Sequence, residues 1–61
     1  MSNILAGPIY DQPSAIRDAL RIATKIRAIV YLVQDRDAAG HPWFVYDTRP
    51  ANQPSIDIEP E

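Results

Sequence analysis

The residues best suited to metal chemistry lie in one polar segment in the middle of the chain. Asp35, Asp37 and Gly40 have the spacing D-x-D-x-x-G, which matches the first positions of a calcium-binding loop. The fifth and twelfth positions, where such a loop needs oxygen ligands, are Ala39 and Tyr46. The segment therefore favours a plain turn over a calcium site, and we expect no metal and no other cofactor.

The single histidine, His41, follows these carboxylates and could act as a general base if one of them oriented its imidazole. No nucleophile completes such a site, because the chain has no cysteine and no Gly-rich phosphate loop. The serines fall in the N-terminus, at a helix start and in a tail. A chain of 61 residues also offers little volume for a substrate pocket. We therefore expect a protein that is not an enzyme, with His41 in a surface loop.

Cations gather on one segment, where Arg17, Arg21 and Lys25 recur every four residues and would form one row on a helix. That helix carries four cations against Asp18, whereas the rest of the chain has two cations and seven anions. The row would suit phosphates, an acidic protein or the acidic part of a second copy, or it could be a solvated face. The net charge of −2 and the pI of about 5.1 disfavour nucleic acid. The acidic remainder could instead imitate a nucleic-acid backbone to a basic partner.

Aromatic side chains supply the second candidate surface. In a strand, Trp43 and Val45 would share one face while Phe44 and Tyr46 share the other. One helix covers only one of these faces, so the other would present aromatic anchors to a partner, unless the rings simply pack in the core or stack on single-stranded bases. The predicted partner-binding residues are Arg17, Arg21, Lys25, Trp43, Phe44 and Tyr46.

One helix and a few strands must position these residues. The segment Asp11 to Ser14 supplies a capping side chain and a first-turn proline, and apolar residues then recur at three- and four-residue spacing to about Arg27. β-branched and aromatic runs at residues 28–34 and 43–46 predict an antiparallel hairpin, and residues 3–10 predict a short edge strand. The prediction is an α+β domain over residues 1–48, with one amphipathic helix packed on a small antiparallel sheet in the order β-α-β-β.

After Thr48 the composition changes. Residues 49–61 include Pro50 and Pro54 and predict a flexible, extended, Pro-rich tail. Within it Ile56 and Ile58 flank an aspartate, so residues 55–59 could add a short strand in the same chain or in a partner.

Size limits how such a domain can be stabilised. A chain of 61 residues builds a small core, and without cysteine it has no disulfide, so a protein partner or homo-oligomerisation is the expected aid. The N-terminal residues do not form a secretory signal, and no apolar run reaches the length of a membrane span. We expect a cytoplasmic protein with no membrane contact.

The helix S-A-x-x-x-A-L-x-x-A (Ser14 to Ala23) and the hairpin segment G-H-P-W-F-V-Y (Gly40 to Tyr46), after a short strand, resemble the layout of very small phage and mobile-element proteins, including anti-CRISPR proteins. The resemblance spans about Ile4 to Thr48, contains no diagnostic motif and transfers no functional residue. It implies a non-catalytic binding module that blocks a host defence complex. The alternatives are a nucleic-acid-binding accessory protein that uses the basic row, and a self-associating structural module.

Overall fold

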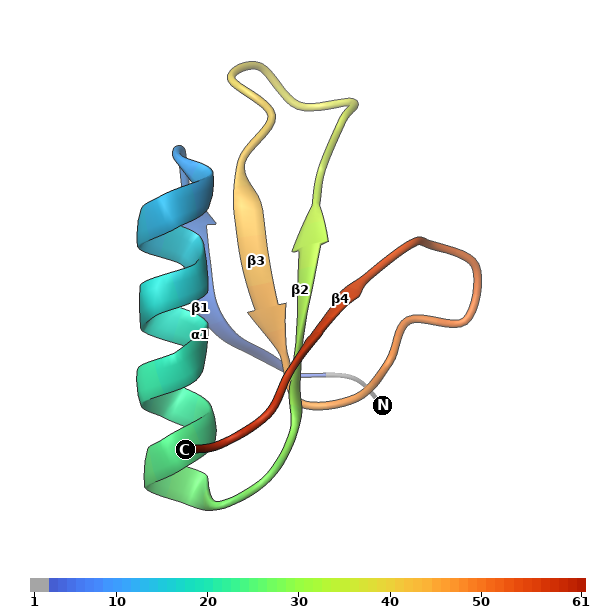
Figure 1. Ribbon diagram of the computed structural model, residues 1–61. Coiled ribbons are helices and arrows are strands. Elements are labelled where there is room, and N and C mark those ends of the chain that lie inside the picture. Colours follow the sequence, from blue (N-terminus) through green and yellow to red (C-terminus); the bar gives the residue numbers. More distant parts are fainter. Residues whose placement is uncertain (1–2) are drawn as a thin grey trace.

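A computed structural model describes residues 3–61 as one helix against a four-stranded antiparallel sheet (Figure 1). In chain order the elements are β1 (Ile4–Ile9), α1 (Gln12–Ile26), β2 (Val30–Gln34), β3 (Trp43–Tyr46) and β4 (Ile56–Ile58). The strands lie side by side in the order β1-β3-β2-β4. The α+β prediction is confirmed, and the predicted order β-α-β-β gains a fourth strand.

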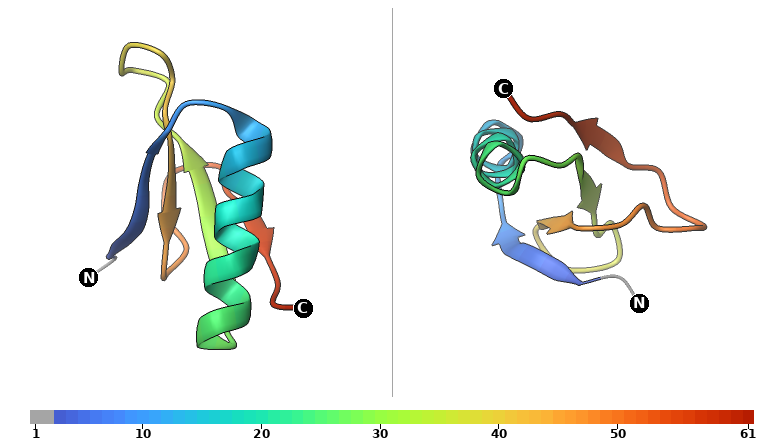
Figure 2. Two further views of the ribbon diagram at one scale, coloured as in Figure 1. Left: turned by 90° about the vertical axis from the view of Figure 1, so that its left-hand side faces the viewer. Right: turned by 90° about the horizontal axis from the view of Figure 1, so that it is seen from below.

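The core lies between α1 and one face of the sheet, which curves around the helix when viewed along the helix axis (Figure 2, right). We call the face toward α1 the concave face and the opposite one the convex face. Three fully buried alanines at four-residue spacing, Ala15, Ala19 and Ala23, form the helix side of the core. They pack with Val30, Leu32 and Val45 of the sheet. Methyl side chains let the helix backbone approach the sheet closely.

The narrow alanine contact has a consequence for the larger side chains of the helix. Sequence periodicity predicts one broad apolar face that includes Ile16 and Ile26. In the structure these two isoleucines are 39% and 49% exposed, because the alanines occupy the line of closest approach and the isoleucines stand at its flank and its end. The fully buried core is therefore small.

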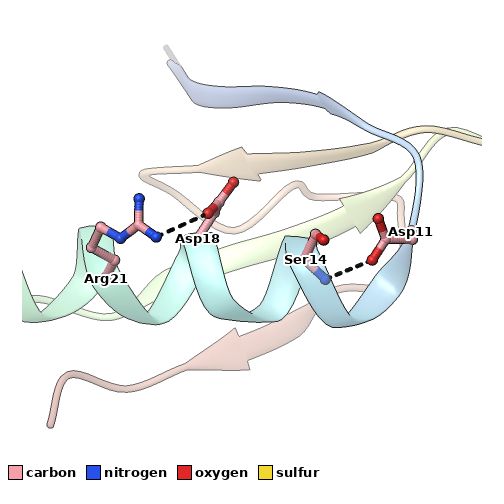
Figure 3. A network of polar contacts seen from close by, with 4 residues as sticks. All are labelled: Asp11, Ser14, Asp18 and Arg21. Carbon is pink, nitrogen blue, oxygen red and sulfur yellow. Dashed lines mark hydrogen bonds and ion pairs between the residues drawn. The ribbon is translucent and has the colours of Figure 1, made fainter.

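The start of α1 is fixed by Asp11, whose backbone is extended and whose carboxylate oxygen Oδ2 accepts the Ser14 backbone N–H at 2.8 Å (Figure 3). This hydrogen bond satisfies one of the amide groups that have no partner within the helix. The helix ends at Arg27, which adopts the left-handed conformation (φ 58°, ψ 43°) and donates its backbone N–H to the Ala23 carbonyl. The predicted boundaries are confirmed to within one residue.

The capping contact predicts a pH dependence. The hydrogen bond from the Ser14 backbone holds the pKa of Asp11 below its ordinary value, with the Ser14 side chain and the charge of Arg17 acting in the same direction. A lowered folded-state pKa means that the stabilisation is present above the unfolded-state pKa of about 3.9 and is lost as the pH falls through the folded-state value. Asp11→Asn keeps an acceptor that does not titrate. In urea unfolding, the free energy of unfolding of wild type should exceed that of this variant at neutral pH. The difference should shrink below about pH 4. A difference independent of pH would contradict the assignment.

The predicted edge strand and hairpin are both present. β1 pairs with β3 from Ile4↔Tyr46 to Ile9↔Trp43, with two register shifts between, and it contains the cis Gly7–Pro8 bond. β2 and β3 pair in continuous antiparallel register over four residues each. No helix among residues 3–61 is long and apolar enough to cross a lipid bilayer.

The prediction of a flexible tail over residues 49–61 needs correction, because residues 56–58, inside the range 55–59 named for a possible added strand, form β4 of the sheet. Strand β4 pairs with β2, where Ile56 lies opposite Leu32 and Ile58 opposite Val30. The two isoleucines therefore extend the concave face, and Ile58 packs against the core. This gain in apolar burial explains why the segment joins the sheet instead of staying free. Its end returns to α1, where the Glu61 backbone N–H donates to the Thr24 hydroxyl at 3.1 Å.

Candidate functional site

Within residues 3–61 the one helix, α1, lies on the concave face, so no described helix covers the convex face of the sheet. Strand register places Tyr31 opposite Tyr46 and Val33 opposite Phe44, and Ile4 of β1 also lies opposite Tyr46. We call these five residues the convex surface. The predicted alternation along residues 43–46 is thereby confirmed, and Phe44 and Tyr46 lie together on it.

Trp43, in contrast, lies on the concave face. It packs against the buried core beside the helix. Val45, two residues further along the same face of β3, belongs to that core. Of the three predicted aromatic partner-binding residues, Trp43 therefore lies on the opposite face from Phe44 and Tyr46 and outside the convex surface. Alternation separates adjacent side chains, and the deeper core burial of Val45 takes Trp43 to the helix side.

The segment that connects β3 to β4 turns the convex surface into a groove. Because β3 and β4 both run antiparallel to β2, residues 47–55 must cross from one side of β2 to the other, and they project away from α1 (Figure 2, right). Gln53 and Pro54 of this crossover line a groove of about 570 Å³. Its other lining residues are Ile4, Val33, Gln34, Asp35, Arg36, Asp37, Phe44 and Tyr46. We call this the convex groove.

Val33 forms the floor of the convex groove. Its side chain is 3% exposed although no helix covers this face. The flanking Phe44 and Tyr46 are half-buried, whereas Ile4, at the other end of the groove, is 55% exposed. The groove thus has a closed apolar floor and a large apolar side chain open to contact.

One arginine is already held on this side of the sheet. Arg49 of the crossover lies with its guanidinium carbon 5.5 Å from the centroid of the Tyr31 ring and forms an ion pair with Asp57 of β4. The Arg49 and Asp57 side chains are partly exposed, so the pair adds little to stability. It shows the chemistry that this face offers to a cation, namely an aromatic ring beside a carboxylate.

The polar loop between β2 and β3 uses its groups locally. The Asp37 backbone N–H donates to Asp35 Oδ1 at 3.0 Å, and the Asp35 backbone N–H donates to the Pro42 carbonyl at 2.8 Å. His41 has a positive φ of 47°, and the Gln34 side chain donates to its backbone carbonyl, not to its imidazole. In the part of the chain that is described, no three His, Cys, Asp or Glu side chains are grouped to hold a metal ion.

The basic row lies on another surface. Arg17, Arg21 and Lys25 occupy the side of α1 opposite the buried alanines, where Arg21 lies 3.7 Å from Asp18. These cations line a shallow hollow with Leu20, Thr24 and Glu61. Since the helix separates this row from the sheet, the row and the convex surface cannot contact the same small patch of a partner.

The groove positions of several residues could not be predicted from the sequence. The sequence places Ile4 only in an edge strand, and its position opposite Tyr46 follows from the pairing of β1 with β3. Gln53 and Pro54 belong to a segment whose prolines indicate a free tail. No local signal marks them as a groove wall, because the crossover depends on β4 pairing with β2.

Comparison with protein-family models, with curated proteins and with solved structures found no match to this chain. The convex groove is therefore interpreted from its own geometry and chemistry.

Proposed function

We propose that this chain is a non-catalytic protein-binding module of the cytoplasm that engages its partner through the convex groove. The observation that carries the proposal is an apolar, aromatic sheet face that no helix covers and that a crossover walls into a groove. Aromatic and branched side chains around a closed apolar floor are the features of interface anchors. Blocking the partner's own binding surface, the mode implied by the likeness to small phage inhibitors, is the narrower form of this proposal.

The chemistry of the groove favours a protein over a nucleic acid as the occupant. Among residues 3–61, its lining contains Asp35 and Asp37 and one cation, Arg36. Nucleic-acid binding depends on neutralising phosphates with several cations, and a lining with excess carboxylate repels them. The basic row remains a second surface, so the test must separate the two.

Ile4→Asp is the sharpest substitution for this purpose. Ile4 lines the groove and is 55% exposed, so the change places a charge in the binding surface without opening the core. Ile16→Asp is the matched control, because Ile16 is also an exposed isoleucine but lies on α1, outside the groove. We expect Ile4→Asp to reduce recovery of the partner about tenfold or more, because it puts a charge against an apolar contact, and Ile16→Asp to leave recovery unchanged. Quantitative mass spectrometry of proteins that co-purify from native lysate measures this.

Arg21→Glu tests the basic row in the same experiment. Circular dichroism confirms that every variant is folded. Arg21 belongs to the basic row and lies outside the groove. Loss of the partner in Arg21→Glu, with normal recovery by Ile4→Asp, would move the binding surface to the helix. That result would overturn the proposal.

A further inference from the structure

The negative net charge of the chain comes from residues 28–58, which contain β2, β3, β4 and their connections. These residues carry four carboxylates (Asp35, Asp37, Asp47 and Asp57) against Arg36 and Arg49, a net of −2. The remaining side chains carry four anions against four cations, a net of zero. Two of the four carboxylates, Asp35 and Asp37, line the convex groove. Such a field attracts cationic partners and orients them before contact.

One guanidinium group of the chain itself is already bound on the convex side of the sheet. Arg49 lies over the Tyr31 ring and pairs with Asp57, so one ring and one carboxylate hold one arginine. Guanidinium groups stack on aromatic faces and bind carboxylates better than ammonium groups do, which distinguishes arginine from lysine at such a place.

The convex groove has the same parts, rings beside a carboxylate, but its own arginine, Arg36, makes no ion pair and no ring contact among residues 3–61. Phe44 and Tyr46 line it with half-buried rings, and Asp37 lies at its loop end. Asp35 Oδ1 accepts the Asp37 backbone N–H, but the Asp37 carboxylate has no ion-pair or hydrogen-bond partner among residues 3–61. Arg36 lines the same end, which leaves that end with a net charge of −1.

From this match we propose that the convex groove binds an extended protein segment that carries an arginine beside a large apolar side chain. The guanidinium lies against the aromatic rings and the Asp37 carboxylate, and the apolar side chain rests on Val33 and Ile4. This inference rests on the proposed protein-binding function and names the partner's chemistry.

The test uses the full chain, labelled with ¹⁵N, and three blocked tripeptides: acetyl-Leu-Arg-Leu-amide, its citrulline analogue and its glutamate analogue. Citrulline keeps the shape of arginine without its charge. We expect the arginine peptide to shift the amide resonances of Val33, Phe44 and Tyr46 with a Kd of about 1 mM, a value suited to a short exposed ligand. Asp37→Asn should weaken that binding about threefold, whereas Asp18→Asn on α1 should not change it.

Three results would overturn the inference: no shifts up to about 10 mM peptide, equal binding of the glutamate peptide, or shifts confined to α1. Concentration-dependent shifts of the groove resonances without peptide would also overturn it, because a second copy would then be the occupant. If the arginine peptide fails while Ile4→Asp still loses its partner, only the arginine assignment falls. If Ile4→Asp also keeps its partner, the proposed function falls with it.

Discussion

Gly7→Ala is expected to leave most of the chain unfolded at room temperature. Gly7 has a φ of 124°, a conformation that residues with a side chain rarely adopt. A Cβ built there would lie 2.6 Å from Phe44 Cδ1 and 2.8 Å from the Trp43 carbonyl oxygen. The backbone oxygen cannot move without breaking the β1–β3 pairing. Strain and overpacking together should cost about 3 kcal/mol or more, which approaches the whole stability of a domain this small.

Gly40→Ala is the matched control for this prediction. Gly40 also has a positive φ, 78°, but an added Cβ would meet only the Tyr10 ring, at 3.1 Å. Tyr10 is exposed and its side chain can move aside. Urea unfolding followed by circular dichroism should therefore show a much smaller loss for Gly40→Ala than for Gly7→Ala. Equal losses would mean that the contact with β3 is not what makes Gly7 necessary.

Local signals in the sequence were sufficient for α1 and for the hairpin. Asp11 and the apolar spacing fixed the start and the length of the helix, since capping and 3.6-residue periodicity act within a few residues. The same periodicity could not say that alanines would take the closest contact while Ile16 stayed exposed. That choice depends on how near the sheet lies, which is a property of the whole fold.

Only part of the candidate site could be predicted from the sequence. Alternation correctly separated Trp43 and Val45 from Phe44 and Tyr46, but it could not say which pair meets the helix. The alternation of Ile56 and Ile58 around an aspartate indicated a short strand at residues 55–59, in the same chain or in a partner. It could not say that this strand would pair with β2, more than 20 positions away, so the wall formed by Pro54 could not be predicted. Prolines in a segment are more typical of a linker.

Removal of residues 55–61 distinguishes an ordered fourth strand from a free tail. A free tail would leave stability unchanged. In the structure, the deletion removes Ile56 and Ile58 from beside Leu32 and Val30, which are fully buried, and it turns β2 into an edge strand. The two isoleucines are only partly buried, so the lost apolar contact should amount to about 2 kcal/mol, with lost β2–β4 hydrogen bonds in addition. We expect a clearly lower urea midpoint, or no cooperative transition.

The control deletes only residues 59–61 and keeps β4 intact. It removes the hydrogen bond from the Glu61 backbone to Thr24. Its free energy of unfolding should therefore stay within about 1 kcal/mol of the wild-type value. If the two deletion variants have the same free energy of unfolding, β4 adds nothing to stability and the crossover has no fixed end. The convex groove would then lose the Gln53 and Pro54 wall, because the pairing of β4 with β2 fixes the end of the crossover that follows these two residues. The longer deletion should accordingly also weaken binding of the arginine peptide, and the shorter one should preserve it.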